Sequence, residues 1–275
     1  SAALLALCEA GEPILVERYT APGIKAAARQ LRLPLHGVAM DEHGILPDEL
    51  DRQARATGAR VAVLTPCLQN PTGASLDAER RVAIAEVARR RGLWIIEDDV
   101  YGVLGSEAPL AVQLAERCLL ISSLSKSVAP GLRLGFIAGA PELLERIDRE
   151  AQATRWAVAP LSLALACEWI ESGVAERRLA WQIEELQQRW RLAARVLGPR
   201  MPQGRAVAPH LWLDGAPPAG LAEACRQHDV EVVPAEVFAV EANPGHAVRV
   251  SLAAAASRAE LKRALEGIVA AWPLA

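Results

Sequence analysis

The chain has 275 residues, with 30 lysines and arginines against 33 aspartates and glutamates, and 52% of its residues are hydrophobic. This composition is typical of a packed globular protein and excludes a disordered or fibrous chain. The net charge of −3 argues against a nucleic-acid-binding surface in this chain, and charges interrupt every apolar run before the roughly 18 residues of a membrane span.

Short apolar runs alternate with amphipathic stretches in the first half of the chain. The runs are continuous rather than alternating, which is typical of strands buried on both faces of an α/β sheet. A helix from 76 to 91 has Ser75 as its expected N-cap and stops at Gly92, after three arginines. The other predicted elements are a helix at 23–33 and strands at 13–17, 61–66, 93–96, 118–123 and 134–138.

The second half has a different pattern. Residues 141–197 are almost wholly helical in pattern, and short predicted strands at 211–213, 230–233 and 247–252 then alternate with helices. We therefore expect two domains, a large one at 1–145 and a smaller one at 146–275 that includes the linking helix.

Polar residues follow the predicted strands of the first half. Asn70 comes after the strand at 61–66, Asp98 and Tyr101 after that at 93–96, and Lys126 after that at 118–123. Arg249 lies within the last strand. Taken singly, these are ordinary turn, capping, surface-charge or ion-pair residues. Because ligands of open α/β sheets bind at the carboxyl ends of the strands, their shared edge favours a common site.

Five segments together carry a resemblance to a known family. They are 68–73 (LQNPTG), 96–102 (IEDDVYG), 123–126 (SLSK) with 129–135 (APGLRLG), 210–213 (HLWL) and 248–252 (VRVSL). The chain resembles the class I/II aminotransferases of fold type I, which depend on pyridoxal 5'-phosphate (PLP). Within them it is most similar to the aminotransferase-like domain of MocR/GntR-type regulators. The resemblance implies a three-layer α/β/α fold with a mostly parallel sheet, and a smaller C-terminal α+β domain.

The resemblance implies a role for each residue toward the cofactor ring. Lys126 would form the Schiff base with PLP and later act as the general base. Asp98 would pair with the pyridinium nitrogen, a role for which Glu97 and Asp99 are rival carboxylates. Asn70 and Tyr101 would hydrogen-bond the phenolic oxygen of the cofactor.

The phosphate and the substrate have their own implied residues. Ser123, Ser125 and Arg133 would hold the cofactor phosphate. Arg249, with Asn70, would bind the substrate α-carboxylate through two parallel N–H donors. The implied reaction converts an amino acid to a 2-oxo acid. The protein is expected to be a homodimer in the cytoplasm and to have no membrane partner.

The sequence departs from the family pattern in two places. Ala21 stands where the family usually has an aromatic residue that stacks on the cofactor, and Tyr19 lies two residues earlier. The family's glycine- and serine-containing phosphate loop is not found here. We therefore expect the chain to be N-terminally incomplete.

Three other functions compete with an aminotransferase. A regulator domain that senses PLP or an effector, with little or no turnover, would use the same residues, and DNA would then be bound by an upstream domain rather than by this chain. Ser123-x-x-Lys126 also fits the acyl-enzyme motif of β-lactamases, but the accompanying Ser-Asp-Asn and Lys-Thr-Gly are missing. The five histidines and five cysteines lack metal-ligand spacing, and scattered cysteines favour reduced thiols.

Overall fold

A six-stranded sheet is the frame of the larger body in the computed structural model, which describes residues 1–154, 158–242 and 245–273. The strand order is β2-β1-β5-β6-β7-β8; the first five strands are parallel, and β8 is antiparallel to β7. The mostly parallel sheet expected from the sequence is confirmed. Its strands are β1 (Ile14–Glu17), β2 (Leu35–Val38), β5 (Val61–Leu64), β6 (Trp94–Asp98), β7 (Cys118–Ser123) and β8 (Gly135–Ala138).

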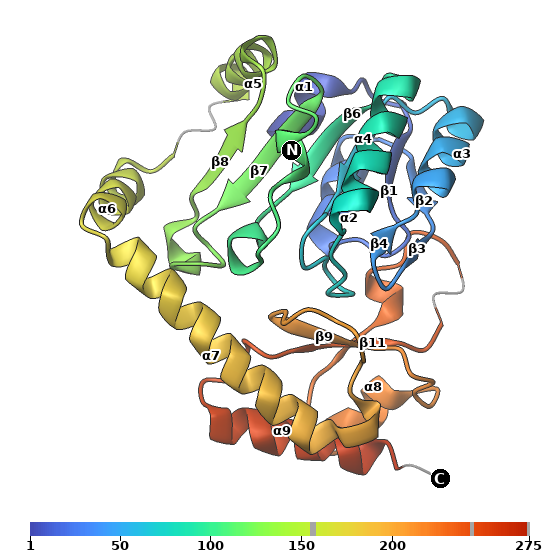
Figure 1. The fold of residues 1–275 in the computed structure, drawn as a ribbon, viewed down its shortest axis with the longest axis vertical. Helices are drawn as coiled ribbons and strands as arrows, with labels where there is room; N and C mark the ends of the chain where they lie inside the picture. The colour runs from blue at the N-terminus through green and yellow to red at the C-terminus, as the bar shows by residue number, and fades with distance from the viewer. Residues whose placement is uncertain (155–157, 243–244, 274–275) are drawn as a thin grey trace.

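Helices cover both faces of this sheet, which gives the expected three layers (Figure 1). Alternate side chains of each strand point to opposite faces, so that Leu15 packs with one group of helices and Val16 with the other. One face is covered by α3 (Pro47–Thr57) and α4 (Ala78–Arg91), and the other by α1 (Ala2–Leu7), α2 (Pro22–Gln30) and α5 (Pro141–Thr154).

The predicted cap of α4 is wrong, whereas its predicted stop is confirmed. Leu76 is buried before the first turn, and its N–H bonds to the Pro66 carbonyl, so the helix starts later. Asp77 is the N-cap, and its carboxylate accepts from the Arg80 N–H at 2.8 Å. The Ser75 hydroxyl instead accepts from the Leu68 N–H at 3.0 Å. Gly92 ends the helix with a positive φ of 66°.

The smaller body contains a three-stranded antiparallel sheet of order β10-β11-β9. Residues of α7, α8, α9 and the sheet form its own hydrophobic core. The strand predicted at 230–233 is shifted: β10 consists of Val233–Pro234, and Val230 and Val232 are buried without pairing in the sheet. The elements are α7 (Val174–Leu197), β9 (His210–Leu213), α8 (Leu221–Arg226), β10, β11 (Val248–Ser251) and α9 (Arg258–Ala271).

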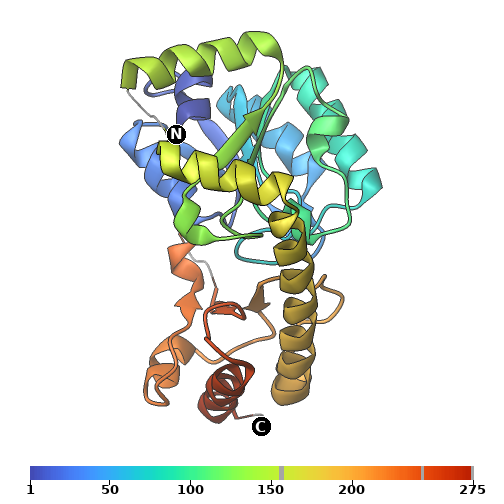
Figure 2. The ribbon, with the colours of Figure 1, turned by 90° about the vertical axis from the view of Figure 1, so that its left-hand side faces the viewer.

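The helix α7 links the two bodies. It runs past the lower edge of the large sheet and down the side of the small domain (Figures 1 and 2). In the chain, α7 follows α5 and α6 (Pro160–Glu171), so the helical stretch predicted at 141–197 consists of three helices. Residues 155–157 of this stretch lie outside the described part. Leu143 and Ile147 of α5 pack into the large-sheet core, so α5 straddles the division predicted at residue 145.

Five elements of the large body have no counterpart in the predicted list. These are α1, β2, the antiparallel pair β3 (Met40–Asp41) and β4 (Gly44–Ile45), and α3. The 3-10 turns η1 (Gly102–Leu104), η2 (Leu110–Val112) and η3 (Pro130–Leu132) connect the strands near the carboxyl edge of the large sheet.

Candidate active site

A cavity of about 520 Å³ lies where the carboxyl edge of the large sheet faces the small domain. The large body contributes Asn70, Tyr101, Ser125 and Lys126 to its wall, and the small body contributes Arg249. The loops after β5, β6 and β7 thus meet the middle of β11, as the order of strand ends led us to expect.

Asp98 lines a second, smaller cavity of about 270 Å³, whose wall also includes Ala21, Ile24 and Val100. Burial raises the pKa of Asp98, whereas the Val100 N–H and the charge of Lys126 lower it. Within a continuous strand, Asp98 and Tyr101 would point to opposite faces of the sheet. β6 ends at Asp98, so strand alternation does not force the two side chains apart.

The two rival carboxylates, Glu97 and Asp99, contact the protein rather than either cavity. Glu97 is fully buried, and its two oxygens accept from the N–H groups of Leu110 and Ala111 at 2.8 Å each. The Asp99 carboxylate occupies the space beside Gly102, where an added Cβ would lie 1.9 Å from Oδ1. Neither Glu97 nor Asp99 lines either cavity, whereas Asp98 lines the smaller one.

Lys126 is exposed on the turn after β7, and its Nζ lies 5.5 Å from the centroid of the Tyr101 ring. Tyr101 is itself held edge-on to the His210 ring, with 5.7 Å between centroids. Burial lowers the pKa of His210 to about 4, so this ring is neutral near pH 7. Its Nε2 lies 2.9 Å from the Gln69 carbonyl, which can only accept, so Nε2 carries the proton.

Gln69 is a residue that sequence reasoning did not assign to any role. It is 1% exposed, and its Nε2 donates to the Tyr19 carbonyl at 2.7 Å. Its Oε1 accepts from the N–H and the hydroxyl of Thr72. These bonds fix the loop that carries Asn70. The signal was present, because both Gln69 and His210 stand in the segments that carry the family resemblance.

Arg249 and Asn70 contact each other across the cavity. Arg249 Nη1 donates to Asn70 Oδ1 at 2.9 Å, while Arg249 Nε is buried and has no hydrogen-bond partner among the described residues. Burial lowers the pKa of Arg249 below its ordinary value, and Tyr101 opposes this effect. The guanidinium also lies over the Phe238 ring at 5.1 Å.

Of the three residues expected to bind the cofactor phosphate, only Ser125 lines the main cavity. The Ser123 hydroxyl lies 3.0 Å from that of Ser125 and 2.8 Å from the Leu134 carbonyl, so it is largely occupied by the protein. Ser125 lines the main cavity. Arg133 is exposed in a left-handed conformation (φ 50°) at the end of η3 and lines neither cavity.

Among the described residues, no aromatic side chain lines the cavity of Asp98, where Ala21 is found. The Tyr19 ring packs instead on Trp212, with 5.1 Å between centroids, and belongs to a hydrophobic cluster of the small domain. Tyr19 therefore does not take the position that an aromatic residue would have at Ala21.

Two classes of site find no support in the described ranges. In residues 1–154, 158–242 and 245–273, no group of three or more potential metal ligands occurs. Within the same ranges, no helix is long and apolar enough to cross a membrane.

The fold and the site define an α/β protein with a cavity between two bodies, and an exposed amine and a partly buried arginine line this cavity. The chain belongs to the family of class I and II aminotransferases, because the family model matches residues 1–268.

Relatives of two kinds are similar to this chain. An HTH-type transcriptional regulator of Bacillus subtilis (strain 168), YdeF, is 29% identical over 271 residues, which is 96% of this chain and 59% of the regulator. The aminotransferase swnA of Metarhizium robertsii is 34% identical over 162 residues, 53% of this chain and 32% of that protein. The chain thus spans about three fifths or less of these relatives.

Solved structures agree on the fold. An archaeal alanine:glyoxylate aminotransferase superposes with a TM-score of 0.89 at 23% identity, covering 98% of this chain and 72% of that one. The aminotransferase Aro8 from Candida albicans has a TM-score of 0.83 at 26% identity, with coverages of 98% and 69%.

Proposed function

We propose that the protein is a PLP-dependent aminotransferase, which transfers the amino group of an amino acid to a 2-oxo acid. The observation that carries the proposal is the meeting of four side chains in one cavity at the carboxyl edge of the large sheet: Asn70, Tyr101, Lys126 and Arg249. Lys126 is the exposed amine of this cavity, Arg249 has a buried Nε without a partner among the described residues, and Asp98 lies at the end of the neighbouring strand β6.

The chemistry of these donors fits PLP. Lys126 would hold the cofactor aldehyde, Asp98 its ring nitrogen, and Asn70 and Tyr101 its phenolic oxygen. Ser123, Ser125 and Arg133 are the proposed phosphate residues. Of these, Ser125 is the best supported, because it lines the same cavity as Lys126.

Each residue then has a defined task. When bound, PLP supplies an electron sink for the carbon that loses its proton. Arg249 binds the substrate carboxylate, and the Asn70 oxygen orients the guanidinium. The Lys126 amine moves the Cα proton, because it is the base that lines the cavity beside Arg249. The Asp98 carboxylate, when ionised, favours a protonated ring nitrogen.

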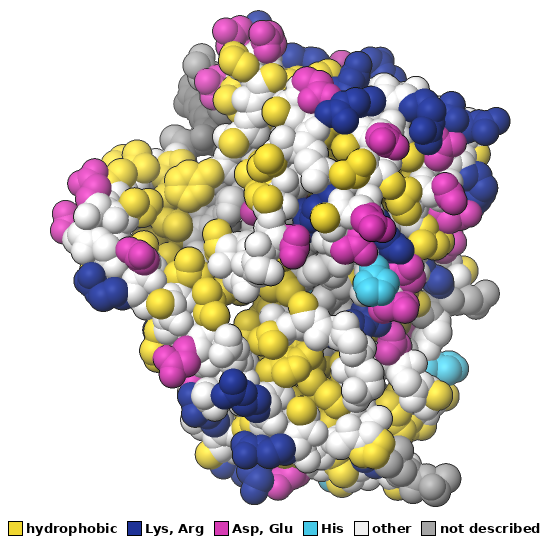
Figure 3. Space-filling model, viewed as in Figure 1, with side chains coloured by type: hydrophobic (Ala, Val, Ile, Leu, Met, Phe, Trp, Pro, Cys, Tyr) yellow, Lys and Arg dark blue, Asp and Glu magenta, His cyan; other side chains and the backbone are white. Residues whose placement is uncertain are grey.

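We also propose that the protein acts as a homodimer in the cytoplasm. Apolar side chains on α6 support the dimer: Leu161 is 81% exposed, and Leu163 and Ile170 are about half exposed. Hydrophobic side chains gather over this helix on the surface (Figure 3). Large exposed apolar patches mark interfaces. The five free cysteines are compatible with a reducing compartment.

The test is the visible absorption of the protein after addition of PLP, compared with Lys126→Ala. The wild-type protein is expected to show a band of lysine-bound cofactor that the variant lacks. Lys25→Ala is the matched control, because the Lys25 amine bonds to the carbonyls of Val237 and Ala239, away from the site. An unchanged band in Lys126→Ala would contradict the assignment. Multiple turnovers with an amino donor and a 2-oxo acid acceptor then test the transfer.

The similarity to YdeF over 96% of the chain favours one alternative, an effector-sensing domain of a MocR/GntR-type regulator with little turnover. Such a domain would bind PLP and an amino compound through the same residues. Binding of PLP and amino acid without formation of a 2-oxo product over many equivalents would favour the sensor. DNA contacts would then belong to another part of the full protein.

A further inference from the structure

The two bodies also touch at segments that do not line the main cavity. Residues 18–25, which follow β1 and begin α2, lie against residues 237–240 of the small domain. Backbone hydrogen bonds of 3.0 Å join the two segments in both directions, and one of them runs from the Thr20 N–H to the Phe238 carbonyl. The two segments together are called the interdomain junction below.

Lys25 adds a side-chain contact to the interdomain junction. It lies in the first turn of α2, and its Nζ donates to the carbonyls of Val237 at 3.0 Å and of Ala239 at 2.6 Å. Val237 ends a 3-10 turn, and a lysine amine is well suited to bind the free carbonyls at such an end. With the bond from Thr20, three successive carbonyls of the small domain accept from the large body.

Phe238 connects the interdomain junction to the site. Its ring is 1% exposed and packs edge-on to the Trp212 ring, with 6.0 Å between centroids. The Arg249 guanidinium lies over the Phe238 ring, with 5.1 Å between Cζ and the centroid. Because a buried ring is closely packed, a shift of its backbone is passed on to the guanidinium that lies over it.

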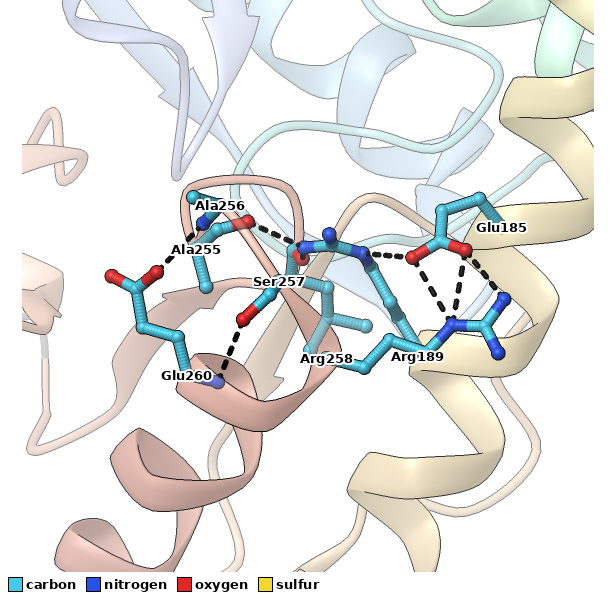
Figure 4. Close-up of polar contacts among 8 residues, drawn as sticks. Glu185, Arg189, Ala255, Ala256, Ser257, Arg258 and Glu260 are labelled. Carbon is cyan, nitrogen blue, oxygen red and sulfur yellow. Dashed lines mark hydrogen bonds and ion pairs between the residues drawn. The ribbon is translucent and has the colours of Figure 1, made fainter.

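The loop after β11 is held in a different way (Figure 4). Arg189 Nε donates to Glu185 Oε1, and its Nη1 donates to the carbonyls of Leu252 and Ala255, each at 2.8 Å. Glu185 also accepts from Arg258, with Nη2–Oε2 at 2.5 Å. These residues belong to α7, to α9 or to the loop between β11 and α9, and both helices share the small-domain core. The network therefore fixes the end of β11 within the small domain and leaves its position relative to the large body to other contacts.

We infer that Lys25 is a positioning residue for carboxylate binding: by holding residues 237–239 against the large body, it keeps the Phe238 ring against Arg249. The inference rests on the proposed function, in which Arg249 binds the substrate α-carboxylate. Lys25 does not line the main cavity, so it acts through Phe238. The Asn70 contact fixes the guanidinium at its edge, and the ring fixes its face.

The test measures by calorimetry how tightly the PLP-treated protein binds pentanoate, which has a carboxylate but no amine and therefore does not react. Lys25→Met removes the donor and keeps most of the length of the side chain. We expect this variant to bind pentanoate about tenfold more weakly, the usual loss when one charge-assisted contact is misplaced, and to keep the band of lysine-bound PLP. Lys25→Arg retains donors for the carbonyls and should restore most of the affinity. Lys262→Met is the matched control, because Lys262 pairs with Glu266 within α9.

Phe238→Leu separates a positioning role from a merely structural one. It removes the ring against Arg249 and retains the backbone carbonyls that Lys25 binds. If Lys25 acts through the ring, adding Lys25→Met to Phe238→Leu should weaken pentanoate binding by less than about twofold further, because the two losses share one path. Fully additive losses in the double variant, or an unchanged affinity in Lys25→Met, would overturn the inference.

Arg249→Gln distinguishes this inference from the proposed function. It should lower the affinity for pentanoate, and the measurement needs no turnover. An unchanged affinity would contradict the carboxylate-binding role of Arg249 and the inference with it. A lower affinity in Arg249→Gln beside a normal one in Lys25→Met would overturn the inference alone. A failed transamination with all affinities as expected contradicts only the proposed function.

Discussion

Arg249 Nη1 donates to Asn70 Oδ1 at 2.9 Å and thereby ties the middle of β11 to the loop after β5. The two residues are 179 positions apart in the chain and belong to different bodies. The contact fixes the guanidinium from one side, while its buried Nε remains without a partner among the described residues. An arginine so arranged can offer a second, pre-oriented edge to a carboxylate.

Arg249→Lys is therefore expected to impair the protein even though it keeps the charge. The ammonium cannot offer two parallel donors, and it cannot bond Asn70 and a carboxylate with the same geometry. We expect kcat/KM to fall by about 10- to 100-fold, which corresponds to the loss of one charge-assisted hydrogen bond. The matched control is the exposed Arg226→Lys, which should change kcat/KM less than twofold. Equal effects of both variants would contradict the role.

The order of the strand ends was enough to predict much of the site. Asn70, Tyr101, Lys126 and Arg249 were expected at one edge, because each follows or lies in a strand, and the structure brings all four to one cavity. Their roles stay predictions. The family motif selected Asp98 over Glu97, and the structure adds the physical reason that Glu97 is occupied by two backbone N–H groups.

The features that the sequence did not predict depend on contacts between segments that are distant in the chain. Tyr19 lies close in sequence to Ala21, but its ring packs on Trp212 of the small domain, which no local pattern indicates. The start of α4 was misplaced because the Leu76 N–H bonds to the Pro66 carbonyl, ten residues earlier, instead of capping the helix. Likewise, the bonds of Arg189 to the carbonyls of the loop after β11 are not visible in helical periodicity.

Ala21→Phe is expected to strengthen PLP binding. Ala21 lines the cavity of Asp98 at the start of α2, and no aromatic ring lines that cavity. An added ring would contribute about 0.5–1.5 kcal/mol of stacking, which is a two- to tenfold lower Kd. Fluorescence titration with PLP measures this Kd. Tyr19→Phe is the control, because it keeps the ring on Trp212 and should leave the Kd unchanged. A weaker Kd for Ala21→Phe would show that the ring does not fit.

The burial of the Glu17 carboxyl group predicts that the stability of the protein depends on pH. It is 2% exposed at the end of β1; its Oε1 accepts from the Thr65 N–H at 2.5 Å, and its Oε2 has no partner in the described part of the chain. Burial, and to a lesser degree the charge of Asp98, raises its pKa from 4.5 to about 7. Because the folded state holds the proton more tightly, ionisation of Glu17 opposes folding.

Glu17→Gln should remove this dependence, since the amide resembles the protonated acid and can still accept from Thr65. Below pH 4.5 the two proteins should be equally stable. Between pH 4.5 and 7 the wild-type protein is expected to lose up to about 3 kcal/mol relative to the variant, and the difference should stay constant above pH 7. Urea unfolding at several pH values measures it. The exposed Glu42→Gln is the control, and parallel pH profiles of the wild-type protein and Glu17→Gln would contradict the prediction.

Arg189→Leu should loosen the small domain at the wall of the main cavity. Arg189 is 9% exposed, and its removal leaves the carbonyls of Leu252 and Ala255 without their donor. Removing one partner of a buried network typically costs about 2–4 kcal/mol, because the groups that remain stay buried and unpaired. We expect urea unfolding to report a loss of this size.

Arg258→Gln is the matched variant, because Arg258 bonds the same Glu185 carboxylate but has a side chain that is 51% exposed. An exposed ion pair contributes about 1 kcal/mol at most, so this variant should lose less than that. In Arg189→Leu the freed loop should also raise KM more than it lowers kcat, since the loop forms part of the binding wall and contains no proposed catalytic group. Equal losses of stability in the two variants would mean that Arg189 acts only as a surface charge.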